Sequence, residues 1–147
     1  MKKTKVICIG EALIDRIRNK LNQGFTDFLG GAPANVACAL SKLEVDSIFI
    51  GRLGSDDFGT KFIAQFNELE VNLDFLQLDN HSSTRVVNVD RDQFGERFFS
   101  GFEASSHLGF ADEALDKKLI KKELTNLEKI FIDTKYLQYS IFFRWLK

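Results

Sequence analysis

A glycine-rich turn ahead of a candidate helix is the first stretch of this sequence that could do chemistry. Residues 28–43 read "FLGGAPANVACALSKL" and contain two adjacent glycines and the chain's only proline. Gly30 and Gly31 allow backbone torsions that other residues avoid, and they leave no side chain between the main chain and a ligand. The first N–H groups of a helix have no intrahelical partners and carry partial positive charge. This turn could therefore bind a phosphate or carboxylate, or donate to hydroxyl groups; a tight strand-to-helix turn without a ligand is the alternative.

Two polar side chains flank the turn. Asn35 adds an amide that both donates and accepts hydrogen bonds, which suits a ligand with several hydroxyl groups. Asp15 lies just beyond the first apolar run, in "VICIGEALID", and ligands of open α/β sheets gather at the carboxyl ends of strands. We expect the helix entrance at Gly31 to lie at the same edge, where a carboxylate could accept hydrogen bonds from the hydroxyl groups of such a ligand. The alternative is that Asp15 is an ordinary solvated loop residue.

Hydrophobic periodicity predicts the elements that position these residues. Apolar runs at 5–10 and 47–51 predict two buried strands. Helical spacing of apolar residues predicts two helices, the first with Pro33 in its first turn. Their expected buried faces are Val36, Ala39, Leu40 and Leu43 in the first helix, and Phe58, Phe62, Phe66 and Leu69 in the second. With a third candidate strand, "NLDFLQL" at 72–78, the order predicts an α/β fold with a mostly parallel sheet flanked by helices.

Two segments interrupt this alternation. Between Asp15 and Gly31, "DRIRNKLNQGFTDFLGG" is too polar and irregular for a core strand. Residues 84–102, "TRVVNVDRDQFGERFFSGF", have two strand-like arms around a glycine-containing turn, which predicts a hairpin. The hairpin is either a lid outside the main sheet or an ordinary extension of that sheet.

Composition excludes several classes of function. The chain has 147 residues, of which 44% are hydrophobic and 28% charged, and this is typical of one soluble globular domain. Its net charge of -1 gives no basic surface for nucleic acid, and no apolar run approaches the roughly 20 residues that span a membrane. The start, "MKKTKVICIGEALID", reads as a strand and not as a signal peptide. Cys8 and Cys38 are expected to be buried free thiols in a cytoplasmic protein.

Four motifs resemble the N-terminal half of the ribokinase-like (pfkB) carbohydrate kinase family, and within it the fructokinase-type members. They are "VICIGEALID", "GGAPANVACALSKL", "IFIGRLGSDDFG" and "GFADEAL", which follow the family's order over residues 4–125. The resemblance implies a central sheet flanked by helices, with a small β lid that closes over a sugar. It also implies ATP with Mg²⁺ as the donor of a phosphoryl group to a sugar hydroxyl, and pairing of subunits through their lids into a homodimer.

The resemblance also assigns residues to a site. Asp15, Gly31 and Asn35 match positions that hold the sugar's hydroxyls, and Gly30 belongs to the same expected substrate-binding set. Residues 16–29 and 84–102 correspond to the lid.

The sequence departs from the family in its second signature. An Asp-Thr-x-Gly-Ala-Gly-Asp stretch, which supplies the catalytic base and an anion hole, is absent, and the chain stops at Lys147, about half the family's length. The tail at 133–147 is atypical of the family. We therefore expect no catalytic, nucleotide-binding or metal-binding residue in this chain. The nearest candidates for metal contact, Asp56 and Asp57, stand where acidic side chains favour the start of a helix.

Our interpretation is a truncated sugar kinase, namely a sugar-binding half that is inactive alone. The alternatives are a subunit completed in trans by a C-terminal half, and a non-catalytic sugar-binding or dimerisation module. A dinucleotide-binding domain is disfavoured, because "GEALID" follows the first strand where G-x-G-x-x-G would be needed.

Overall fold

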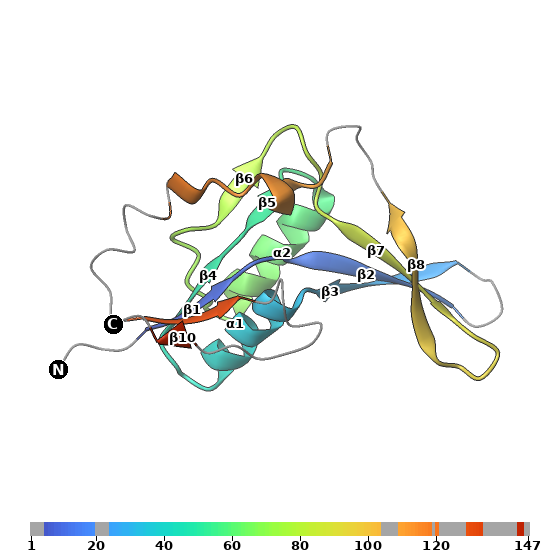
Figure 1. Ribbon diagram of the computed structural model, residues 1–147, viewed down its shortest axis with the longest axis horizontal. Helices are drawn as coiled ribbons and strands as arrows, with labels where there is room; N and C mark the ends of the chain where they lie inside the picture. The colour runs from blue at the N-terminus through green and yellow to red at the C-terminus, as the bar shows by residue number, and fades with distance from the viewer. Residues whose placement is uncertain are drawn as a thin grey trace.

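The computed structural model describes residues 5–19, 24–103, 109–118, 120, 129–133 and 144–145. They form two parts, which are a body that contains both helices and a four-stranded sheet that extends from it (Figure 1). We call this second sheet the projecting sheet; its strand order is β3-β2-β7-β8.

The body is built on a sheet in the order β10-β9-β1-β4. β1 (Lys5–Ile9) lies parallel to β4 (Ser47–Ile50) and to β9 (Lys129–Asp133), whereas β10 (Arg144–Trp145) runs antiparallel to β9. The predicted α/β class is confirmed, but the sheets are mixed. Most of the atypical tail at 133–147 lies outside the described residues.

Among the described residues, the body also contains helices, a 3-10 turn and a strand pair. They include the helices α1 (Ala32–Lys42) and α2 (Asp57–Glu68) and the 3-10 turn η1 (Ala111–Ala114). β5 (Arg52–Gly54) and β6 (Gln77–Asp79) form a short parallel pair. Among the described residues, no helix is long and apolar enough to cross a membrane.

The strands β1 and β4 are buried on both faces. Cys8 and Phe49 belong to the core that also contains Ala34 and Ala37 of α1 and Phe62 and Phe66 of α2. Ile7, Ile48 and Ile50 pack with Ile120 in a second cluster. Because side chains alternate between the two faces of a strand, burial of both faces requires continuous apolar runs, as at 5–10 and 47–51.

The expected buried face of α2 is confirmed, and that of α1 is displaced. Phe62 and Phe66 are buried, with Phe58 and Leu69 packed against the same core. In α1 the buried residues are instead Pro33, Ala34 and Ala37, while Leu43 is 71% exposed. Of the four expected residues, Val36 and Leu40 pack partly buried against the core, whereas Ala39 and Leu43 are exposed, so the predicted face is only partly confirmed.

The third predicted strand, 72–78, is wrong over most of its length. Only an isolated bridge at Asn72 and the strand β6 from Gln77 are present. Between them the Asn72 side chain accepts from the Asp74 N–H at 3.0 Å, and the Leu76 N–H donates to the Leu73 carbonyl at 2.9 Å. In this segment, local turn hydrogen bonds take the place of the inter-strand hydrogen bonds that a β-strand would make.

The two interrupting segments form the projecting sheet together. It consists of β2 (Leu13–Arg18), β3 (Phe25–Gly30), β7 (Val86–Arg91) and β8 (Arg97–Glu103), and β7–β8 is the predicted hairpin. Residues 13–18 were not expected as a strand, so Asp15 lies within β2 and not in a loop. Lid closure by segments 16–29 and 84–102 stays a prediction.

The two cysteines are free thiols. Cys8 is buried, whereas Cys38 is only half-buried. Burial and the neighbouring Cys38 raise the pKa of the Cys8 thiol to about 11, so it stays protonated and unreactive at neutral pH.

Candidate functional site

Asp15 and Gly30 are held together by the pairing of β2 with β3. Leu13 lies opposite Gly30 and Asp15 opposite Phe28 in this antiparallel ladder. A Cβ atom built on Gly30 would collide with the Asp15 carboxylate and would lie 3.4 Å from a methyl of Leu13. The carboxylate therefore occupies the space that a side chain at position 30 would fill, which is why glycine is needed there.

Gly31 joins this ladder to α1. It is the N-cap residue of the helix and has a φ of 97°, a conformation that only glycine adopts readily. A Cβ at this position would lie 2.6 Å from the carbonyl oxygen of Glu11. The two segments "GEA" and "GGAP" therefore contact each other backbone to backbone, which brings the start of α1 next to the start of β2.

The N-terminus of α1 carries no neutralising group of its own. Gly31 offers no side-chain cap, and no acidic residue lies in the first turn. Because these first N–H groups carry partial positive charge, the helix start can donate to an oxygen-rich ligand. Asn35 is exposed one turn into the helix, where its own N–H donates to the Gly31 carbonyl at 2.9 Å.

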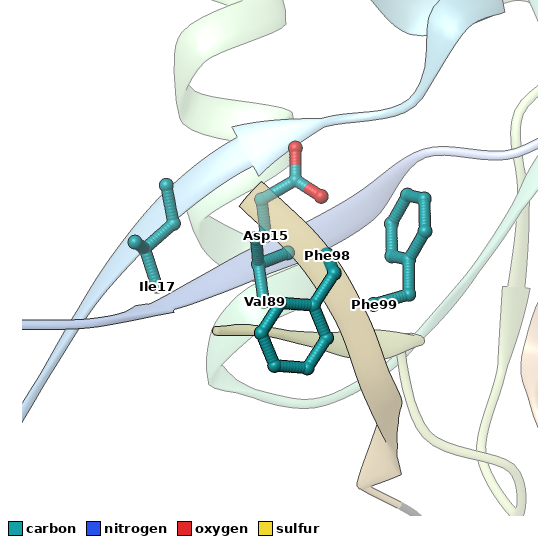
Figure 2. A pocket seen from close by; sticks show the side chains of 5 residues that line it. All are labelled: Asp15, Ile17, Val89, Phe98 and Phe99. Carbon is teal, nitrogen blue, oxygen red and sulfur yellow. The ribbon is translucent and has the colours of Figure 1, made fainter. Parts of the chain in front are cut away.

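A hollow lies on one face of the projecting sheet (Figure 2). Its volume is about 170 Å³, below the roughly 300–1,000 Å³ of pockets for drug-sized ligands. It is lined by Asp15 and Ile17 of β2, Val89 of β7, and Phe98 and Phe99 of β8. This arrangement offers one carboxylate among apolar walls, which suits a small molecule with both hydroxyl groups and C–H surface.

The structure brings some of the predicted site residues together. Asp15 and Gly30 are in direct contact, and Gly31 connects them to α1. Asn35 is not among the described residues that line the hollow. Sequence reasoning missed Phe98 and Phe99, although an adjacent aromatic pair in a predicted hairpin was the signal that could have marked them.

The opposite face of the projecting sheet is charged. Arg16 pairs with Asp27 of β3 at 2.7 Å and also with Glu103 of β8. Arg18 pairs with Asp90 of β7 at 2.6 Å. The hydrogen bonds from Arg16 and Arg18 lower the pKa of Asp27 and of Asp90, respectively. β2 thus presents Asp15 and Ile17 to the hollow and two arginines to the other side.

Asp56, a candidate for metal contact, is engaged in capping α2. Its carboxylate accepts from the Gly59 N–H at 2.8 Å, and from the N–H and hydroxyl of Thr84 at 2.7 and 2.8 Å. Asp57 is exposed in the first turn of the helix. Within the part of the chain that the structure describes, no group of three His, Cys, Asp or Glu side chains could hold a metal ion, and the Asp56 carboxylate is already engaged by Gly59 and Thr84.

Arg85 connects the base of the hairpin to η1. Its guanidinium binds Asp112 in a bidentate pair at 2.9 and 3.0 Å and contacts Glu113 at 2.9 Å. The same group lies over the rings of Phe110 and Phe102, at 4.3 and 5.3 Å from their centroids. Because Phe102 belongs to β8 and Asp112 belongs to η1, Arg85 links the projecting sheet to the body.

The fold and these motifs define a class of protein. The sequence profile described as "pfkB family carbohydrate kinase" matches residues 3–137, and the chain therefore belongs to this family. The resemblance read from its motifs is confirmed.

Individual relatives are fructokinases. The chain is 35% identical over 132 residues to fructokinase-2 of Oryza sativa subsp. japonica, covering 86% of this chain and 38% of that protein. The crystal structure of fructokinase from Xylella fastidiosa matches with a TM-score of 0.65 and 34% identity, over 80% of this chain and 39% of that one. A double mutant of the Vibrio cholerae O395 fructokinase, solved with fructose, ADP and potassium ion, matches with a TM-score of 0.57 and 33% identity, over 67% and 32%. The chain thus spans about two fifths of the length of the first of these relatives.

Proposed function

We propose that this chain is the sugar-binding part of an ATP-dependent sugar kinase, with fructose as the substrate that its relatives favour. The observation that carries this proposal is the Asp15 carboxylate, which lines the hollow directly above Gly30 and beside the start of α1. The fructose bound to the Vibrio cholerae relative supports the choice of sugar.

Each residue of the proposed site has a distinct part in binding. The Asp15 carboxylate accepts hydrogen bonds from sugar hydroxyls, while the first N–H groups of α1 and the Asn35 amide donate to sugar oxygens. Gly30 and Gly31 hold these groups together, because their missing side chains leave room for the Asp15 carboxylate and for the Glu11 carbonyl. Closure of the projecting sheet over the sugar excludes water, which otherwise competes as phosphoryl acceptor.

Phosphoryl transfer needs groups that this sequence does not contain. The Asp-Thr-x-Gly-Ala-Gly-Asp signature is absent, and bound ATP with Mg²⁺ would supply the phosphoryl group. A general base alone contributes roughly 10²–10⁴-fold to rate. We therefore expect these 147 residues by themselves to bind sugar without turning it over, and a segment that carries the missing signature would have to complete the catalytic site.

Calorimetric titration with fructose and ribose tests the sugar site. Asp15→Asn and Asn35→Ala each remove one hydrogen-bonding function, and loss of about 1–3 kcal/mol corresponds to weakening of roughly 5- to 150-fold. Asp57→Asn removes an exposed carboxylate outside the site and is expected to bind like the wild type. Unchanged affinity in both site variants contradicts the proposed site.

A separate assay tests the catalytic half of the proposal. Purified chain is incubated with ATP, Mg²⁺ and a panel of sugars, and ADP release is followed. No sugar-dependent release is expected. Turnover that requires a separately produced C-terminal half supports completion in trans. Turnover by the chain alone contradicts the prediction that the chain is inactive by itself.

Self-association through the projecting sheet is a second candidate function. Phe28, Phe99 and Phe102 are exposed on the face of this sheet that carries the hollow, and exposed apolar surface marks interaction sites. Light scattering is expected to show a dimer, and Phe28→Ser, which lies outside the hollow's lining, is expected to weaken it. A wild-type monomer at high concentration contradicts this function.

A further inference from the structure

We propose that Arg85 is a positioning residue of the sugar site, and that its buried ion pair with η1 holds the projecting sheet in one orientation to the body. This inference rests on the proposed sugar-binding function and adds to it the contact that keeps the two halves of the site in place. Arg85 acts on Asp15 through the sheet and does not itself touch the sugar.

The proposed sugar site is divided between the two parts of the molecule. Asp15 belongs to β2 of the projecting sheet, whereas the first N–H groups of α1 belong to the body. A ligand that binds both therefore requires a fixed separation between them. A misplacement of about 1 Å can cost a site much of its effect.

The strand β2 is anchored along both of its edges. Along one edge it pairs with β3, which leads through Gly31 into α1. Along the other edge the Ile14 N–H donates to the Arg85 carbonyl at 2.8 Å, and Asp15 lies opposite Val87. The second anchor is therefore next to Asp15 in the chain, so a contact that holds Arg85 also holds the carboxylate.

The three residues before β7 fasten this second edge to the body. The Ser83 carbonyl accepts from the Ala111 N–H of η1 at 3.0 Å. Thr84 donates from its N–H and its hydroxyl to the Asp56 carboxylate at the start of α2. Arg85 adds a side-chain contact with η1. Two separate elements of the body thus fix the direction in which β7 leaves it.

The ion pair of Arg85 with Asp112 is largely withdrawn from water. Both side chains are mostly buried, at 15% and 14% exposure, and the guanidinium donates to both carboxylate oxygens. The rings of Phe110 and Phe102 cover the same group and lie 5.9 Å apart between centroids. A planar group that is paired at both donors and covered by two rings has one favourable orientation.

Such a pair constrains geometry more than it stabilises the fold. Withdrawing two charges from water costs about as much free energy as their attraction returns, and replacement by apolar residues of similar volume is often neutral or stabilising. Apolar side chains at these two positions would pack in several arrangements, whereas the bidentate pair permits one. The specific contribution of Arg85 is therefore the orientation of the sheet.

The pair lies on the face of the sheet that carries Asp15. Phe102 lies opposite Val87 on β8, and Asp15 lies opposite Val87 on β2, so these three residues share one face. On the other face, the Arg16 guanidinium lies 5.6 Å from the centroid of the Phe58 ring of α2. The sheet thus contacts the body on both faces, and these contacts together oppose tilting in either direction.

The double variant Arg85→Met with Asp112→Leu tests the inference on the full chain. It removes both charges at once, so neither is left buried without its partner, and the urea midpoint should equal or exceed that of the wild type. Calorimetric titration with fructose should show affinity weakened about tenfold, within the range for coupled neighbours. A purely structural role would instead make affinity and stability fall together.

Spin-label distances report the orientation of the sheet without any sugar. Phe94→Cys at the hairpin turn and Leu43→Cys at the end of α1 provide labelling positions that are 82% and 71% exposed. Cys38→Ala removes the half-buried thiol from this background. We expect the double variant to give a broader or shifted distance distribution than the chain with the ion pair intact.

The matched control is the double variant Arg18→Met with Asp90→Leu. It removes an arginine–aspartate pair from the same sheet, but this pair joins β2 to β7 and does not join the sheet to the body. Its fructose affinity and its distance distribution should equal those of the wild type.

The outcomes are distinguishable. If Arg85→Met with Asp112→Leu binds fructose as the wild type does, the inference is overturned while the sugar site stands. An unchanged distance distribution overturns it as well, because the sheet then keeps its orientation without the ion pair. If the wild type binds no sugar, the proposed function falls, and the positioning role falls with it.

Discussion

The body and the projecting sheet are stabilised by different interactions. β1 and β4 are apolar on both faces, with Phe49, Ile48 and Ile50 fully enclosed. β2 has a hollow on one face and two arginine pairs on the other. The body therefore depends on packing, which salt affects little, whereas the projecting sheet depends partly on exposed charges, which are individually weak. A sheet with this division can be stable in register and still move relative to the body.

The largest effect is expected in the body, at Phe66. Its ring is 1% exposed and lies 5.0 Å from that of Phe49 and 5.7 Å from that of Phe62. Phe66→Ala should lower the free energy of unfolding by about 3–5 kcal/mol because it leaves a cavity. Urea denaturation measures this loss, with Phe94→Ala as a control within about 0.5 kcal/mol of wild type. Equal losses would contradict the contrast between the two parts.

The joint between the two parts should come next. Gly31→Ala places a side chain at a residue with positive φ and also brings its Cβ into collision with the Glu11 carbonyl. Gly24 has a similar φ of 93°, but a Cβ at this position would have no atom within 4 Å. A non-glycine residue in a sparsely populated positive-φ region costs roughly 1–3 kcal/mol, and Gly24→Ala provides a reference for that cost without a collision. Gly31→Ala should lose clearly more stability in thermal or urea unfolding. Similar losses in both would show that the backbone contact at Gly31 is loose.

A smaller, pH-dependent effect is expected at Asp79 in the body. Bonds from the backbone N–H groups of Ser82 and His81, and the Arg52 pair, lower its pKa to about 2. A lowered folded-state pKa contributes stability that is present above the ordinary value near 4 and lost as pH falls toward 2. Asp79→Asn should therefore be less stable than wild type at pH 7, with the difference disappearing by pH 2 in urea titrations. A constant difference would contradict a charge effect.

The smallest effect is expected in the projecting sheet, at the pair of Arg18 with Asp90. The Arg18 side chain is 47% exposed, so a double-mutant cycle of Arg18→Gln and Asp90→Asn should give a coupling of about 0.2–1 kcal/mol. High salt should reduce this coupling, whereas the loss in Phe66→Ala should stay the same. A coupling that is large and insensitive to salt would remove the distinction drawn between the two parts.

The contrast also explains which features could be predicted from sequence. The periodicity of apolar residues and local turn chemistry predicted α2, the first turn of α1 with Pro33, and the hairpin of β7 and β8. β2 was missed because the partners of Arg16 and Arg18 include residues 87 and 72 positions away, so their charges looked like loop polarity. The direct contact of Asp15 with Gly30 depends on strand register. A β-bulge at Ser100 of β8 depends on two strands at once, and no single segment encodes it.

The pairing of β2 with β7 has a consequence for the order of folding. Ile14 lies opposite Val86, so a ribosome must add about 72 residues between the two strands. At roughly 5–20 residues per second, this takes about 4–14 seconds. During that time β2 and β3 form an isolated hairpin, which is marginal in water. Pulse-labelling hydrogen exchange on stalled nascent chains should show the β2 amides protected only after β7 has emerged, and early protection would contradict this order.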